Sequence, residues 1–88
     1  MDKQSKIAKK IIILYVLNIL RQATPDRPIT QSAIADFLNE RGIPCDRKTV
    51  GRNVGYLIEF GYPIVRVERK GYYIDSEKLK ECKNPFVI

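Results

Sequence analysis

The chain has 88 residues, of which 44% are apolar and 30% are charged, and its net charge is +6 with no histidine. This length supports a single domain, residues 1–88, and the positive charge favours phosphate-rich partners. The absence of histidine removes the commonest general base and metal ligand, and Cys45 and Cys82 form no Cys-x-x-Cys pair, so we expect no enzyme, no metal site and no cofactor.

Residues 3–22 are predicted to form a first helix, because strong helix formers dominate its start. Apolar side chains occur nearly all round it, and a helix of this kind is buried on more than one side. Either the rest of the domain covers both faces, or a second copy of the chain or a further domain covers one. A membrane role is not expected, because Asn18 and Arg21 interrupt an apolar run that is also too short to span a bilayer. The surface expected for a homodimer comprises Ile12, Tyr15, Val16 and Ile19.

A loop at residues 24–28 and a second helix at residues 31–40 follow. Two prolines and an aspartate define the loop. Thr30 is the expected N-cap of the helix, and Ile29 with Ile34 fits a hydrophobic staple across that cap. The buried stripe of this helix is predicted to be Ile34, Phe37 and Leu38.

A third helix is predicted at residues 47–60, with Asp46 as its N-cap and Gly61 as its stop signal. Cys45 and Val50 are placed to form the matching staple. Cys45 is therefore interpreted as a packing residue, and a redox role is the alternative, because helix N-termini and cations lower thiol pKa values. Val50, Val54, Leu57 and Ile58 are predicted to face inward.

Residues 64–68 and 71–75 are predicted strands, rich in valine, isoleucine and tyrosine and joined by a tight turn. A lone hairpin is marginal in water, so this one is expected to pack on the helices. Ser76 is the expected cap of a short last helix at residues 77–83. The apolar tail at residues 86–88 has no predicted burial site.

Helix, helix, turn, helix and two-stranded hairpin is the order of a winged helix-turn-helix, an α+β fold that is mainly α. The segment Asp46–Asn53 (DRKTVGRN), with Leu57–Ile64 and Lys70–Tyr73, resembles the N-terminal DNA-binding domain of bacterial WYL-domain transcriptional regulators, which are related to the DeoR-type winged helices. The similarity covers roughly residues 7–75. The ligand-sensing domain of that family is not contained in the 88 residues, and Gly51 stands where the family commonly carries a bulky residue.

The third helix and the hairpin, or wing, are expected to contact DNA. The first turn of the third helix presents free N–H groups and cations, and Arg52 one turn later is the best candidate for a guanine contact. The hairpin tip suits the minor groove or flanking backbone, and the start of the second helix could receive a phosphate. Lys3, Lys6, Lys9 and Lys10 add a basic arm with an electrostatic role. The expected DNA-contact residues are Arg47, Lys48, Thr49, Arg52, Asn53, Tyr56, Gln31, Ser32, Arg66, Arg69 and Lys70.

Two glycines, Gly51 and Gly55, interrupt the exposed side of the predicted third helix. Each costs about 1 kcal/mol of helix stability relative to alanine. They either let another backbone approach closely, or lie on a solvent face that tolerates them.

The favoured function is sequence-specific binding of duplex DNA as a bacterial or phage transcriptional regulator, or as part of one. Such a protein would act in the cytoplasm at the nucleoid, with a homodimer through the first helix as an option, and two isolated thiols suit that reducing compartment. The alternative is a winged-helix protein-interaction module, such as a small mobile-element protein that binds a host factor. The doubly apolar first helix and the two glycines motivate this alternative.

Overall fold

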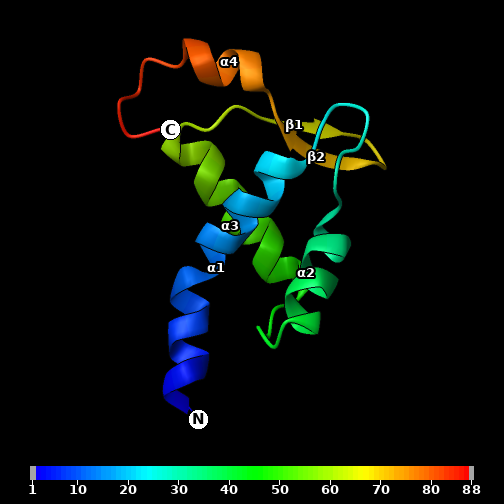
Figure 1. Cartoon of the computed structure of the whole chain (residues 1–88), viewed down its shortest axis with the longest axis vertical. Coiled ribbons are helices and arrows are strands. Elements are labelled where there is room, and N and C mark those ends of the chain that lie inside the picture. The colour runs from blue at the N-terminus through cyan, green and yellow to red at the C-terminus, as the bar shows by residue number, and fades with distance from the viewer. Residues whose placement is uncertain (1, 88) are drawn as a thin grey trace.

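The computed structural model describes the backbone of residues 2–87 and the side chains of residues 11–87, and within that range it is an α+β structure that is mainly helical (Figure 1). The first half of α1 projects from the body of the molecule, and the hairpin and α4 lie at the opposite end. The side chains of the basic arm, Lys3, Lys6, Lys9 and Lys10, lie outside the described residues. In chain order the elements are α1 (Asp2–Gln22), α2 (Gln31–Glu40), α3 (Arg47–Phe60), β1 (Ile64–Val67), β2 (Gly71–Ile74) and α4 (Ser76–Glu81).

Local capping signals explain where α2 and α3 begin, and both helices occupy their predicted ranges. The Thr30 hydroxyl accepts a hydrogen bond from the Ala33 amide at 3.0 Å, and the Asp46 carboxylate accepts one from the Thr49 amide at 2.8 Å. Each bond satisfies one of the free N–H groups at a helix start. At the other end of α3, Gly61 has a φ of +125°, which favours glycine and stops the helix.

The core lies where α1, α2 and α3 meet the hairpin. One face of α1 enters it through Ile12, Val16 and Leu20, which are at most 1% exposed. The expected homodimer surface is therefore wrong in part, because Ile12 and Val16 already pack inside the domain. The remaining buried residues include Ile34, Ala35, Leu38, Val50, Val54, Leu57, Tyr62, Ile74 and Val87.

Two residues predicted to be buried are exposed. Phe37 is 40% exposed, because α2 turns Ile34, Ala35 and Leu38 inward instead. The Arg41 guanidinium lies 3.5 Å from the centre of the Phe37 ring and covers it with a cation–π contact. Ile58 is 48% exposed, at the edge of the inward stripe of α3.

The hairpin (residues 64–74) pairs β1 with β2 in antiparallel register, from Ile64 opposite Ile74 to Val67 opposite Gly71. Each strand ends one residue before its predicted limit. A third segment joins the sheet, because Ile29 and Tyr72 exchange backbone hydrogen bonds of 2.9 and 2.8 Å. This bridge lies directly before α2 and anchors its start to the hairpin.

The C-terminal segment packs back on the molecule, contrary to expectation. Asp75, not Ser76, caps α4 and accepts hydrogen bonds from two backbone amides. Val87 is only 9% exposed and belongs to the core. The Asn84 carboxamide donates to the Phe60 carbonyl at 2.9 Å, so the tail is fastened to the end of α3.

Within residues 2–87, no helix combines the length and apolar character needed to cross a membrane.

Candidate nucleic-acid interface

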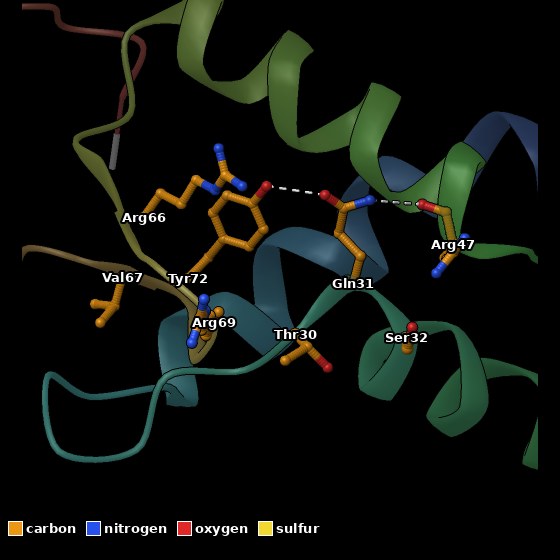
Figure 2. A pocket seen from close by; sticks show the side chains of 9 residues that line it. Thr30, Gln31, Ser32, Arg47, Arg66, Val67, Arg69 and Tyr72 are labelled. Carbon is orange, nitrogen blue, oxygen red and sulfur yellow. Dashed lines mark hydrogen bonds between the residues drawn. The ribbon is translucent and has the colours of Figure 1, made fainter.

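Three segments that are distant in sequence meet around a shallow groove of about 300 Å³ (Figure 2). The start of α2 forms its floor, the start of α3 one side and the hairpin the other. We call it the three-arginine groove, after Arg47 of α3 and Arg66 and Arg69 of the hairpin. No carboxylate lines it among the residues that the structure describes. The full lining is Thr30, Gln31, Ser32, Arg47, Arg66, Val67, Arg69, Gly71 and Tyr72.

The hairpin tip depends on two unusual backbone positions. Arg69 adopts a φ of +66° in the turn, and Gly71 follows with a φ of +120°. A Cβ atom on Gly71 would overlap the carbonyl group of Ile29 and would lie 2.6 Å from the Thr30 amide nitrogen. Glycine at this position therefore lets β2 approach the start of α2, which brings Arg69 to the groove.

Gln31, on the floor of the groove, is hydrogen-bonded to both of its sides. Its Oε1 accepts a hydrogen bond from the Tyr72 hydroxyl at 2.8 Å, and its Nε2 donates to the Arg47 carbonyl at 3.0 Å (Figure 2). The side chain of Gln31 is thus occupied by bonds within the chain, whereas Ser32 beside it is exposed. Sequence reasoning missed Tyr72, because nothing in a β-strand pattern indicates which partner a tyrosine hydroxyl finds.

Gly51 does not lie on an open face. A Cβ atom there would come within 2.6 Å of Gln31 Nε2, so the glycine leaves space for the glutamine side chain. Gly55, by contrast, has open space beside it, because apart from its own helix backbone and chain neighbours no atom would lie within 4 Å of a Cβ atom there. The two glycines, which the sequence placed on one exposed face, have different surroundings.

Four further residues of the expected contact set, Thr49, Arg52, Asn53 and Tyr56, gather on another side of α3. Asn53 is partly buried and donates to the Thr49 carbonyl at 2.8 Å, so its amide is used within its own helix. Arg52 is exposed, and Tyr56 is 50% exposed. These four residues line a second depression of about 350 Å³ together with Ile12 and Pro44.

Lys48 and Lys70 are exposed but line neither hollow. Lys48 and Arg52 lie four residues apart and therefore on one face of α3. The structure therefore divides the predicted contact residues between the three-arginine groove and the second depression, and leaves Lys48 and Lys70 outside both.

The surroundings at the start of α3 favour the ionised form of the Asp46 side chain. The pKa of Asp46 is lowered, first because its carboxylate accepts the Thr49 N–H, and further by Arg52 and Lys48. Burial raises the pKa of the neighbouring Cys45 thiol, and Asp46 raises it further. A raised pKa disfavours the thiolate, which argues against the alternative of a redox-active thiol at Cys45 and favours the packing role.

Comparisons of the chain with protein-family models, with curated proteins and with solved structures found no match.

Proposed function

We propose that this chain binds duplex DNA as a winged helix-turn-helix, acting in the cytoplasm as a bacterial or phage transcriptional regulator or as part of one. The observation that carries the proposal is the three-arginine groove, which Arg47, Arg66 and Arg69 line from two sides and which has no carboxylate among its described lining residues. Arginine presents several donors in a planar fork that suits phosphate oxygens. A DNA backbone phosphate is the ligand that best matches this chemistry.

In this proposal, α3 enters the major groove and the hairpin acts as the wing. Lys48 and Arg52 share the outward face of α3 and would meet the duplex. Arg52 remains the best candidate for reading a base, since a bidentate contact to guanine is worth about 1–3 kcal/mol of discrimination. The hairpin cations Arg66, Arg69 and Lys70 would lie along the flanking backbone or minor groove.

The test is a series of fluorescence-anisotropy titrations with a labelled duplex between roughly 50 and 200 mM salt. Affinity should fall steeply as salt rises, because each phosphate contact releases counterions. Arg47→Gln, Arg66→Gln and Arg69→Gln should each weaken binding to all sequences and reduce the salt slope by about 0.9 per lost contact. Arg52→Ala should instead reduce the preference for a selected sequence. Binding that is absent at low salt, or that ignores salt, would contradict the proposal.

A protein-interaction role is the second candidate, and exposed apolar side chains favour it. Ile58 and Phe60 on the last turns of α3 are 48% and 49% exposed, and Phe86 in the tail is 73% exposed. Asn84 holds the tail that carries Phe86 to the Phe60 carbonyl, and neighbouring exposed apolar residues can mark protein contacts. This candidate predicts that Phe86→Ser and Ile58→Gln abolish partner capture while Arg52→Ala leaves it unchanged.

A further inference from the structure

Gln31 occupies the space that Gly51 leaves beside α3. A Cβ atom at position 51 would lie 2.6 Å from Gln31 Nε2, 3.1 Å from Cδ and 3.3 Å from Oε1, so the whole carboxamide group sits against the glycine. Distances below about 3 Å cannot be accommodated, and the glutamine would have to move. Because Gln31 is a flexible side chain, it could swing away at small cost to the rest of the fold.

In its present place the carboxamide satisfies two groups at once. It accepts from the Tyr72 hydroxyl of β2 and donates to the Arg47 carbonyl of α3, at 2.8 and 3.0 Å. These bonds connect the hairpin, which carries Arg66 and Arg69, to the helix turn that carries Arg47 (Figure 2). The same side chain therefore reaches both walls of the three-arginine groove.

We propose that Gln31 is a positioning residue, seated in the space provided by Gly51, that fixes the spacing between the hairpin and α3 and so the relative placement of the three arginines. Its effect on affinity rests on the proposed DNA-binding function. Its effect on the hairpin does not, because the two hydrogen bonds exist without a ligand. Tyr72 is the hairpin's half of this link.

Comparison with Gly55 distinguishes this role of Gly51 from a direct contact between Gly51 and DNA. If glycines in α3 served only to let DNA approach, Gly51 would have open space beside it, as Gly55 has. Gly51 instead contacts Gln31, so its substitution should act through the glutamine. Gly55→Ala is thus the matched control, since it is the same change in the same helix without a neighbouring side chain.

The experiment compares the wild type with Gly51→Ala, Gln31→Ala, their double variant, Tyr72→Phe and Gly55→Ala. The first measurement is amide hydrogen exchange of the hairpin, followed by NMR without DNA. Gly51→Ala, Gln31→Ala and Tyr72→Phe should each speed exchange at the Tyr72 amide by roughly 2- to 10-fold, the effect of losing about one hydrogen bond. Gly55→Ala should not speed it.

The second measurement is duplex-DNA affinity by fluorescence anisotropy at fixed salt. Gly51→Ala and Gln31→Ala should each weaken binding by roughly 2- to 10-fold. Their double variant should be no weaker than either single one, because Gly51→Ala has no glutamine left to displace. Circular dichroism should show that Gly51→Ala keeps its helix content and still unfolds cooperatively, so that weaker binding does not come from a lost fold.

The two proposals fail in different ways. Additive losses in the double variant would overturn the positioning role and show that Gly51 acts on DNA directly. Unchanged hairpin exchange in Gly51→Ala would also overturn it. A wild-type chain that does not bind DNA would contradict the proposed function, whereas faster hairpin exchange in Gly51→Ala but not in Gly55→Ala would still support the link.

Discussion

At the scale of single residues, one amino-acid type serves different physical needs. Gly71 has a left-handed φ of +120° and lies against the Ile29 backbone, whereas Gly55 lies in regular helix with open space beside it. Glycine is required at the first position and is only a cost at the second. The two sites therefore predict opposite outcomes for the same substitution.

Gly71→Ala should destabilise the fold by about 2–4 kcal/mol, because it adds both backbone strain and a clash with Ile29. Gly55→Ala should stabilise it by about 0.5–1 kcal/mol, through the higher helix propensity of alanine. Urea unfolding followed by circular dichroism measures both. Equal effects of the two changes would contradict this assignment.

Asp46 should make the stability of the fold depend on pH in the acidic range. Its pKa is lowered chiefly by the hydrogen bond from Thr49, so its charged form stabilises the folded state. That contribution is fully present above the unfolded pKa of about 3.9 and is lost as pH falls through the lower, folded pKa. The amide of Asp46→Asn can cap the helix without titrating.

Below about pH 4, therefore, the midpoint of thermal unfolding should fall more for the wild type than for Asp46→Asn. Scans at pH values from about 2 to 6 test this, and other carboxylates contribute equally to both proteins. Parallel curves would show that the Asp46 carboxylate adds nothing that depends on pH.

At the scale of elements, the sequence predicts those features that depend on residues close together in the chain. The starts of α2 and α3 and the end of α3 follow from Thr30, Asp46 and Gly61, whose effects reach only three or four residues along the chain. The Ile29–Tyr72 bridge joins residues that no local pattern connects. The burial of Val87 could not be predicted for the same reason, because it depends on residues far away in the sequence.

The candidate site likewise has features that the sequence predicts and features that depend on how the helices pack. Arginine in the first turn of a helix and at a hairpin tip could be predicted from residue type and position. That Arg47 shares a groove with Arg66, while Arg52 lies beside a different depression, depends on how α3 is rotated against its neighbours. The spacing of apolar residues predicts which face of α3 is buried, but residues at the edge of that face can be assigned wrongly. Ile58 is an example, because it is predicted to face inward and is exposed.

The end of α3 should depend on the tail. The last carbonyls of a helix have no partner within it, and Asn84 supplies one for Phe60. Asn84→Ala should therefore lower the free energy of unfolding by about 1 kcal/mol. Lys83→Ala, an exposed neighbour, is the control, and chemical denaturation of both variants measures the difference. Equal stability of the two would show that the Asn84 bond contributes no net free energy.

At the scale of the whole molecule, the outer side of α1 remains a candidate surface for self-association. Leu14 is 58% exposed and Tyr15 is 38% exposed, whereas Ile12 and Val16 are buried. Under the proposed function, in which dimers read paired half-sites, a second copy is expected to cover Leu14 and Tyr15.

Light scattering should therefore show a mass that rises from monomer to dimer with concentration. Leu14→Gln should shift this transition to higher concentration, and Phe86→Gln, in the C-terminal tail, should not. A constant monomeric mass at high concentration would rule out this use of α1.

The bridge between Ile29 and Tyr72 also has a consequence for the order of events during synthesis. Both helices that flank the three-arginine groove lie between these two residues, inside a loop that the bridge closes. Contacts between residues far apart in sequence form late, because the intervening chain must first be ordered. A nascent chain whose β2 is still inside the ribosome can form α2 and α3 but cannot fix them to the hairpin. The final arrangement of the arginines should therefore appear only after Tyr72 has emerged.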